Sequence, residues 1–338
     1  MNEIEKIDKN FEKNIINDEQ KQLLKEYVTR LRSNNIPIIY NLRHLRKLFQ
    51  ITKADQPEFF GPSRQTLYRT FYIAKKSGGY RKIEAPIEKL ELIQRWIKEE
   101  ILDKFVVSDC AKGFKKGTNI VDNALPHCGK QVVLNIDIKD FFPSIKYADV
   151  FKMFNYMGYT YQVCHLLTKL CTNGNNVLPQ GSPASPAISN LVNLKLDKRL
   201  AKLAESIGAS YTRYADDITF SGNKALVRYK KIIEQIINEE HYEINHQKQR
   251  LSYNYQRQEV TGLIVNNGVS VNKKILKELN NAIYYIEKFG LISHMQHENL
   301  TQSSYKEHLY GLAYFVNMVD QEKGKYYLDK LDRLNWEC

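Results

Sequence analysis

Hydrophobic residues recur with two different periods along this chain, and these periods separate helical from extended segments. Residues 19–33 show the helical period, with Leu24, Val28 and Leu31 on one face, and residues 41–51 repeat it. Both segments carry Lys and Arg on their polar faces. We therefore expect residues 1–60 to form a helical N-terminal region.

An extended pattern first occurs at residues 66–73, and Gly78-Gly79 predicts a turn from it into a second strand. This hairpin is basic, because Lys75, Lys76, Arg81 and Lys82 flank its turn. Such side chains could clamp triphosphate oxygens. An ordinary solvated turn is the alternative.

Three further strand patterns follow. A short apolar strand ends at Asp137, residues 211–221 form a candidate hairpin, and residues 258–271 are expected to form two short strands around Asn267-Gly268. Helical patterns occupy 87–105, 147–170, 188–207, 224–240 and 273–338. This order predicts an α+β fold, in which an antiparallel sheet with helices is flanked by a helical arm and a helical tail.

The charge of the chain indicates a polyanionic partner. Lys and Arg number 50 against 38 Asp and Glu, which gives a net charge of +12 and an isoelectric point near 9.2. Nucleic acid is the commonest such partner, although general solubility would also explain the excess. The basic segment 273–338, with tyrosines among its lysines, suits RNA, but a solvated face over a tyrosine-rich core would look the same.

Hydropathy and cysteine usage indicate a cytoplasmic protein. The mean hydropathy is −0.50, no run of about 18 apolar residues suggests a membrane span, and the first residues lack the apolar segment of a signal peptide. The cysteines number five, an odd count, and none forms a CxxC pair. Reduced thiols therefore fit better than a disulfide framework or a zinc site.

Carboxylates supply the strongest chemical signal. Tyr-Ala-Asp-Asp at 214–217 places Asp216 and Asp217 at the expected tip of a hairpin. Adjacent carboxylates repel each other unless a cation offsets the repulsion, and hard oxygen ligands favour Mg²⁺. A solvated turn is the plainer alternative. Asp137 adds a third carboxylate and the Ile138 carbonyl a further ligand, so a site for two metal ions and nucleotidyl transfer is predicted.

A loop of unusual stiffness lies between these carboxylates in the sequence. Residues 178–186, Leu-Pro-Gln-Gly-Ser-Pro-Ala-Ser-Pro, fix the backbone ahead of a helix. This geometry can present Gln180 and main-chain N–H groups to a nucleotide or a template. An ordinary helix start with Pro186 in its first turn is the alternative, but the nearby aspartates favour the functional interpretation.

Taken together, these segments resemble the A, B and C motifs of reverse transcriptases. The matching runs are NIDIKDFFPSI (135–145), LPQGSPASPAISN (178–190) and YADD (214–217). Asn245 and Lys248 resemble the N-x-x-K of the next motif, and GFKKG (113–117) also fits the family. The resemblance covers about residues 65–270.

Two more runs resemble elements of the retron reverse transcriptases in particular. Asn123 to His127 (NALPH) resembles their NAxxH element, and Val260-Thr261-Gly262 resembles their VTG element. Each string alone is weak, since His127 could be a structural loop histidine and Val260 could belong to a strand that ends at a glycine. Their order around YADD makes them more specific.

The resemblance implies a catalytic role for four side chains. Asp137, Asp216 and Asp217, with the Ile138 carbonyl, are implied to bind two Mg²⁺ ions, for which Mn²⁺ is a substitute. Lys248 is implied to protonate the leaving pyrophosphate.

The resemblance also implies binding residues. Phe142 corresponds to an aromatic gate against the ribose 2′-hydroxyl, Gln180 contacts the incoming dNTP, and Arg81 with Lys75 or Lys76 contacts its triphosphate. The residues implied to bind RNA are Asn123, His127, Val260, Thr261 and Gly262.

The family folds as a right hand. This implies fingers over 61–130 with a further fingers segment at about 150–180, a palm over 131–271 and a helical, RNA-binding thumb over 272–338. Retron enzymes bind a structured cognate non-coding RNA, start DNA from a guanosine 2′-hydroxyl in it and produce msDNA, a branched RNA–DNA. Members act in bacterial anti-phage defence, with an effector protein encoded nearby.

Two other functions stay open at this point. Another compact reverse transcriptase, of the group II intron or diversity-generating type, would share the A, B and C motifs but not NAxxH and VTG. A polymerase-like RNA-binding scaffold or antitoxin would not need all three aspartates. Loss of DNA synthesis with retention of RNA binding in an Asp216 and Asp217 double variant would exclude the scaffold.

Overall fold

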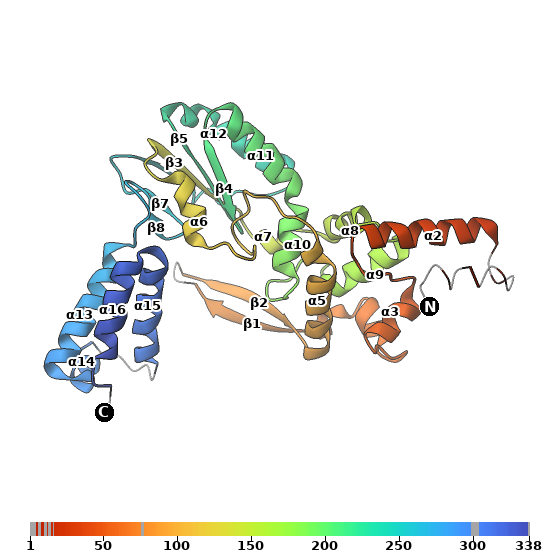
Figure 1. Ribbon diagram of the computed structural model, residues 1–338, viewed down its shortest axis with the longest axis horizontal. Coiled ribbons are helices and arrows are strands. Elements are labelled where there is room, and N and C mark those ends of the chain that lie inside the picture. The colour runs from red at the N-terminus through yellow and green to blue at the C-terminus, as the bar shows by residue number, and fades with distance from the viewer. Residues whose placement is uncertain are drawn as a thin grey trace. The chain divides into compact units, whose positions relative to one another are not determined.

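The computed structural model describes residues 5, 8–9, 12, 15, 17–75, 78–298 and 304–336. Lys76 and Cys338, both considered above, lie outside the described residues. The chain divides into two compact units, and each is described by itself (Figure 1). The first comprises Met1–Lys115, Ile138–Arg199 and Glu234–Ile244, and the second comprises Lys116–Asp137, Leu200–Ile233 and Asn245–Cys338.

The first unit begins with the helices that the sequence predicts. Helix α2 (Asp18–Ser33) starts at Asn17, whose side chain accepts a hydrogen bond from the Gln20 N–H at 2.8 Å. This cap satisfies an N–H group that has no partner inside the helix. Helices α3 (Leu42–Leu48) and α4 (Gln56–Phe60) follow. The short α4 gives too few residues for a periodic signal, so the sequence did not predict it.

The predicted basic hairpin is also present in the first unit. Strands β1 (Tyr68–Ala74) and β2 (Tyr80–Pro86) pair antiparallel, after the short helix η1 (Arg64–Leu67). Helix α5 (Glu88–Glu100) comes next and ends earlier than the predicted 105, because the last turn becomes the 3₁₀ helix η2 (Leu102–Lys104).

The remaining helices of the first unit precede and follow the stiff loop 178–186 in the sequence. They are α7 (Phe141–Ser144), α8 (Tyr147–Tyr156), α9 (Tyr161–Cys171) and α10 (Ser185–Val192). The single helix predicted over 188–207 is two helices, since α11 (Leu194–Ser206) is separated from α10 at Asn193. The Asn193 side chain and the Asn193 N–H both donate to the Ser189 carbonyl, at 2.7 Å and 3.2 Å.

A four-stranded antiparallel sheet forms the centre of the second unit. Its order is β4-β5-β3-β6. The strands are β3 (Val132–Asp137), β4 (Ser210–Tyr214), β5 (Asp217–Gly222) and β6 (Arg250–Tyr253). The sequence predicted the first three but not β6, whose polar residues lie on an edge strand. Short helices α6 (Ile120–Ala124), η3 (Leu125–His127) and η4 (Lys224–Tyr229) also belong to this unit, and α12 (Lys230–Glu239) follows η4.

The predicted pairing around Asn267-Gly268 is present only as a single antiparallel bridge between Ile264 and Ser270, and the strands of the hairpin are placed differently. Strands β7 (Glu259–Val260) and β8 (Leu263–Ile264) pair around Thr261 and Gly262 instead. Both turn residues have positive φ, 45° and 84°, as a two-residue turn between twisted strands requires. Asn267 and Gly268 lie in the wider loop closed by the bridge between Ile264 and Ser270.

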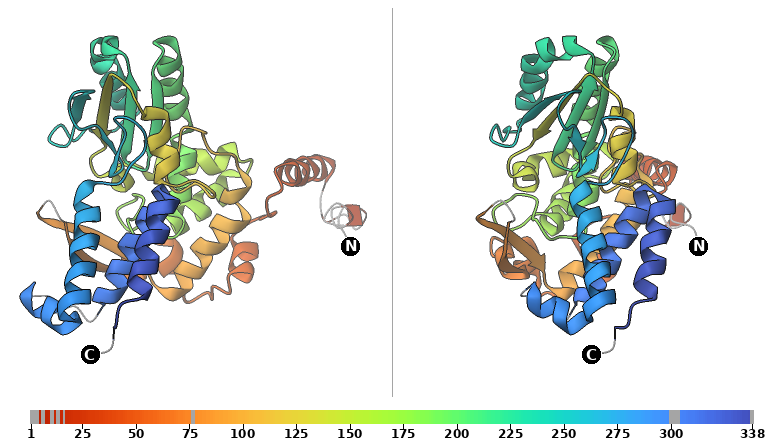
Figure 2. Two further views of the ribbon diagram at one scale, coloured as in Figure 1. Left: turned by 60° about the vertical axis from the view of Figure 1, so that its left-hand side comes forward. Right: turned by 90° about the vertical axis from the view of Figure 1, so that its left-hand side faces the viewer.

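A bundle of four helices completes the second unit. These are α13 (Lys273–Phe289), α14 (Leu291–His297), α15 (Tyr305–Val319) and α16 (Gln321–Asp332). Helices α13, α15 and α16 run next to one another, and the short α14 lies at one end of α13 (Figure 1 and Figure 2). Leu279, Leu309, Val316 and Leu331 are fully buried in their shared core. The helices and antiparallel sheets together confirm the α+β class. No helix among the described residues is long and apolar enough to span a membrane.

Candidate active site

The Tyr-Ala-Asp-Asp segment forms the turn between β4 and β5. Tyr214 ends β4 and pairs with Asp217, the first residue of β5, so Ala215 and Asp216 make the turn. Ala215 has a φ of 58°, a left-handed conformation. Beneath it, the fully buried Arg213 donates an Nη1 hydrogen bond to the Ala215 carbonyl at 3.3 Å. Main-chain pairing and this guanidinium thus hold the two carboxylates at the tip.

Asp137 lies directly opposite Asp217. Strand β3 pairs with β5 so that these two aspartates are partners in the register. The Asp137 carboxylate accepts hydrogen bonds from the Asn245 side chain at 3.1 Å and from the Lys248 ammonium at 2.9 Å. The Asn245 N–H also donates to the Asp137 carbonyl at 2.8 Å. The structure therefore brings Asp137, Asp217 and the N-x-x-K residues together in the second unit.

The electrostatics of this cluster follow from its crowded charges. Displacement of water from the Asp217 carboxyl raises its pKa to about 7, with further contributions from the Asp216 and Asp137 charges. The hydrogen bond to Asp137 raises the pKa of Lys248, against a smaller opposing effect of burial. Lys248 thus stays protonated while it offsets part of the carboxylate repulsion.

These residues fit a divalent cation in chemistry. Carboxylate oxygens are hard ligands of the kind that Mg²⁺ and Mn²⁺ take, and the charges of Asp216 and Asp137 add to the effect of burial on the pKa of Asp217. Among the described residues, no three His, Cys, Asp or Glu side chains lie close enough to hold a metal ion as they stand. One oxygen of the Asp137 carboxylate is engaged by Lys248 and the other by Asn245.

The main-chain hydrogen bonds around Ile138 leave out its carbonyl, which is the predicted backbone ligand. Ile138 forms an isolated antiparallel bridge with Ile244. The hydrogen bonds of this bridge run from the Asn245 N–H to the Asp137 carbonyl and from the Lys139 N–H to the Glu243 carbonyl, each at 2.8 Å. The bridge therefore does not use the Ile138 carbonyl.

Gln180 belongs to the first unit, where its segment is tied to the basic hairpin. The Glu84 N–H of β2 donates to the Gln180 carbonyl at 2.8 Å. The next residue, Gly181, has a φ of 135°, and a Cβ there would lie 2.8 Å from the Glu84 carbonyl oxygen. This contact requires a glycine. The Ser182 hydroxyl anchors the segment further by donating to the Gln94 side chain at 2.7 Å.

Phe142 borders a small cavity of the first unit. The cavity has a volume of about 310 Å³, and residues 181–186 of the stiff loop provide much of its lining. The Phe142 ring packs 5.9 Å from Phe114 and 5.4 Å from Phe141, between ring centroids. Phe114 is the aromatic residue of the GFKKG run and also lines the cavity. Phe142, Phe114 and the stiff loop thus border the same cavity.

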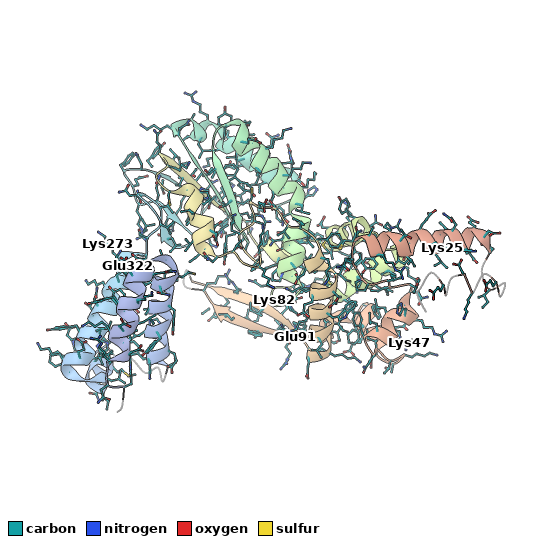
Figure 3. The ribbon with its side chains drawn as sticks, viewed as in Figure 1. Lys25, Lys47, Lys82, Glu91, Lys273 and Glu322 are labelled. Atoms are coloured by element: carbon teal, nitrogen blue, oxygen red, sulfur yellow. The ribbon has the colours of Figure 1, made fainter. Side chains whose placement is uncertain are left out.

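The basic hairpin has exposed and engaged cations. Lys75 is exposed and lies near the turn. Arg81 is also exposed and pairs with Ile73 across the hairpin. Lys82 instead pairs with Glu84 at 2.9 Å, and Glu84 also accepts hydrogen bonds from Gln65 and Asn173. Figure 3 shows Lys82 on this hairpin. Lys75 and Arg81, the two hairpin residues predicted to contact a triphosphate, are therefore both exposed to an anion in solution.

The residues implied to bind RNA divide by burial. Asn123, His127 and Val260 are 0%, 0% and 1% exposed, so their side chains do not reach a macromolecule in this structure. Of the five residues predicted to bind RNA, only the turn residues Thr261 and Gly262 are accessible. Thr261 is half-buried and Gly262 is exposed. The alternative of a structural histidine fits His127.

Sequence reasoning missed the residues that hold the site together. Thr212 and Ser221 bind His127, Arg213 supports the turn, and Asn135 joins β5 to β7 by accepting from Thr219 and donating to the Glu259 carbonyl. Only a charged residue, Arg213, directly before the YADD run could have signalled a supporting role.

Comparison with known proteins supplies the family. The family model described as reverse transcriptase (RNA-dependent DNA polymerase) matches residues 73–266. The retron Ec86 reverse transcriptase of Escherichia coli is 34% identical over 90% of this chain and 93% of its own length. The retron Mx65 reverse transcriptase of Myxococcus xanthus is 35% identical over 76% of this chain. The chain therefore belongs to the reverse transcriptase family and, within it, to the retron reverse transcriptases.

Coverage differs among these relatives. The alignment spans 62% of the Myxococcus protein, somewhat less than two thirds of its length. A solved telomerase structure from Candida albicans is 10% identical, covering 91% of this chain and 61% of the telomerase chain at a TM-score of 0.46. That similarity is too slight to add to the assignment. Membership of the reverse transcriptase family itself implies a polymerase that depends on a divalent metal.

Proposed function

We propose that this chain is a retron-type RNA-directed DNA polymerase that makes msDNA on a structured cognate RNA, starting from a guanosine 2′-hydroxyl. The observation that carries the proposal is the pairing of Asp137 with Asp217 beside Asp216, in a chain of the retron family. Three carboxylates in such a cluster are the donor set for nucleotidyl transfer. A scaffold that only binds RNA would have no need of this repulsive arrangement.

Asp137, Asp216 and Asp217 would hold two Mg²⁺ ions, with the Ile138 carbonyl as a further ligand and Mn²⁺ as a substitute. When bound, these ions would activate the attacking hydroxyl and stabilise the charge of the leaving pyrophosphate. Asn245 keeps one Asp137 oxygen in place through its 3.1 Å hydrogen bond. Lys248 releases the other oxygen and becomes the proton donor for pyrophosphate.

Lys248→Ala should lower the rate of nucleotide addition by roughly 10²-fold, because a general acid contributes about that much. The measurement is the single-turnover rate of primer extension at saturating dNTP. Lys139→Ala is the matched control, since Lys139 forms an exposed ion pair with Glu243 at 2.9 Å and should leave this rate unchanged. A Lys248→Ala rate equal to wild type would contradict the proton-donor role.

The incoming dNTP would be bound by residues of the first unit. Arg81 and Lys75 supply exposed cations for the triphosphate, Gln180 contacts the nucleotide, and Phe142 packs against the sugar. The main-chain bond from Glu84 to Gln180 supports this assignment, because it fixes the stiff loop to the strand that carries Arg81.

Phe142→Val should weaken discrimination against ribonucleotides by about 10- to 100-fold, because the smaller side chain leaves room for a 2′-hydroxyl. The ratio of kcat/KM for a dNTP and the matching rNTP measures this effect. Phe151→Leu, in α8 and packed on Tyr147 and Tyr161, is the control. Unchanged discrimination in Phe142→Val would remove Phe142 from the sugar site.

The parts of the polymerase follow from these assignments. We assign the fingers to 61–130 with about 150–180, the palm to 131–271 and the thumb to 272–338, behind the N-terminal helical region 1–60. The palm then contains the four-stranded sheet, and the thumb is the bundle α13–α16. Exposed tyrosines on the thumb, among them Tyr284, Tyr314 and Tyr326, suit stacking with unpaired RNA bases.

The partners proposed are the cognate non-coding RNA, its msDNA product and an effector protein encoded nearby, in a cytoplasmic bacterial defence system. The test is to express the chain with the DNA upstream of its gene and to run extracted nucleic acid on a denaturing gel with and without RNase. A short DNA that shifts after RNase, and that an Asp216→Asn, Asp217→Asn double variant does not make, is expected. Absence of this DNA, with extension of a supplied primer retained, would leave a polymerase but not a retron enzyme.

A further inference from the structure

His127 connects the two strands that carry the catalytic turn. Its Nδ1 lies 2.7 Å from the Ser221 hydroxyl of β5, and its Nε2 lies 2.8 Å from the Thr212 hydroxyl of β4. Asp216 and Asp217 lie in and directly after the turn that joins these strands. One fully buried side chain therefore spans both arms of the hairpin.

The hydrogen-bond directions define the state of this ring. The Thr212 hydroxyl lies 3.4 Å from the Asn123 carbonyl, to which it can donate; with that bond made, it accepts from His127 Nε2. Nδ1 is then left to accept from Ser221, which corresponds to a neutral ring protonated at Nε2. Burial, together with the Lys130 charge, lowers the pKa of His127 to about 3, so the ring keeps this state at physiological pH.

The segment that carries His127 is itself fixed. Ala124 of α6 packs in one apolar cluster with Val133, Val260, Leu263 and Val265. The Asn123 side chain donates to the Thr261 hydroxyl at 3.4 Å, and α6 lies against both β4 and β8. A histidine on such a segment can hold the hairpin arms in place, because α6 is also anchored outside them, against β8 and the Val133–Val265 cluster.

We propose that His127 is a positioning residue for catalysis: by bridging Thr212 and Ser221 it sets where the β4–β5 hairpin places Asp216 and Asp217. This inference rests on the proposed polymerase activity. It assigns His127 a role inside the protein in place of the predicted contact with RNA. It also explains why the Asn123–His127 run accompanies the Val260–Gly262 run in this chain, since the two pack together. Catalysis is sensitive to displacements of about 1 Å in the reacting groups.

The test uses the full-length protein with a homopolymeric RNA template and a DNA primer, so that no cognate RNA is needed. His127→Phe removes both hydrogen bonds and keeps a ring, whereas His127→Gln can keep one. Active enzyme is counted from the burst amplitude, and kcat is expressed per active site. Thr212→Val and Ser221→Ala give the same information if His127→Phe does not fold.

We expect kcat per active site to fall between about 10- and 100-fold in His127→Phe and less in His127→Gln, with KM for dNTP and affinity for RNA unchanged. Tyr27→Phe, which loses the buried hydroxyl bond to the Ile39 carbonyl at 2.6 Å, is the control and should keep the wild-type kcat. A wild-type kcat with fewer active molecules would show a merely structural role and overturn the proposal. So would weaker RNA binding at unchanged kcat. An inactive wild-type protein would instead refute the polymerase activity.

Discussion

Replacing Asp217 with asparagine should abolish DNA synthesis and, in a chelating buffer, should make the protein more stable. Loss of one ligand from the carboxylate cluster removes several kcal/mol of transition-state stabilisation, which corresponds to a fall in rate of at least about 10³-fold. The gain in stability has the opposite origin. The pKa of Asp217 is raised from 3.8 to about 7, so its ionised form is disfavoured in the folded protein.

The sign of the pH dependence follows from this shift. A carboxyl whose pKa is higher in the folded state destabilises the fold once it ionises, so the penalty is absent below about pH 4 and complete above about pH 7. The full shift would correspond to about 4 kcal/mol, but Asp217 is solvent-exposed as a residue. Screening by solvent reduces the expected gain to about 1 kcal/mol at pH 8.

Urea denaturation in EDTA at pH 8 and pH 5.5 measures this effect, with primer extension in Mg²⁺ run in parallel. The free energy of unfolding of Asp217→Asn should exceed that of wild type at pH 8, and the difference should shrink at pH 5.5. Asp109→Asn, at an exposed position paired with Lys115, is the control and should retain activity. An Asp217→Asn protein that still extends primers at the wild-type rate would contradict the assignment of the site.

Gly181→Ala should destabilise the protein and weaken dNTP binding, through the loop that carries Gln180. The new Cβ would lie 2.8 Å from the Glu84 carbonyl oxygen, a main-chain atom that cannot move alone. We expect a loss of about 2–3 kcal/mol in stability from the clash and the strained φ. Displacement of Gln180 should also raise KM for dNTP by about 10-fold or more.

Gly208→Ala separates the two causes of this loss. Gly208 also has a positive φ, 64°, but a Cβ there meets nothing within 4 Å. Its substitution should therefore cost only the conformational part, about 1 kcal/mol, with KM unchanged. Equal effects of the two substitutions on KM would mean that the contact between Gly181 and Glu84 does not position the nucleotide site.

The sequence predicted most elements because their patterns are local. Asp137 ends an apolar strand, Gly78 and Gly79 mark a turn, and the helical tail repeats its apolar residues, so none of these depends on distant partners. The β6 strand was missed because its polar residues carry no strand pattern, and it forms only by pairing with β3. The helix break at Asn193 was missed because the helical pattern of apolar residues runs across it, from Ile188 to Leu200.

For the site, the sequence indicated which residues take part but not how buried they are. Motif spacing indicated the three aspartates and Lys248, and the register of β3 with β5 brings Asp137 opposite Asp217. Burial could not be read from motifs, so Asn123, His127 and Val260 were expected to contact RNA although they are enclosed. The turn signal Asn267-Gly268 was outweighed at Thr261-Gly262, where the apolar residues Val260 and Leu263 pack in the core. A tertiary contact decided the turn there, not a local preference.

The central claim is that this protein starts DNA on its own RNA. The most direct measurement incubates purified protein with RNA transcribed from the DNA upstream of its gene, labelled dNTPs and Mg²⁺, without any DNA primer. We expect labelled DNA that migrates together with the RNA on a denaturing gel. After RNase the product should migrate as a shorter species and should keep its label. Labelled product only when a DNA primer is added would contradict priming from the RNA.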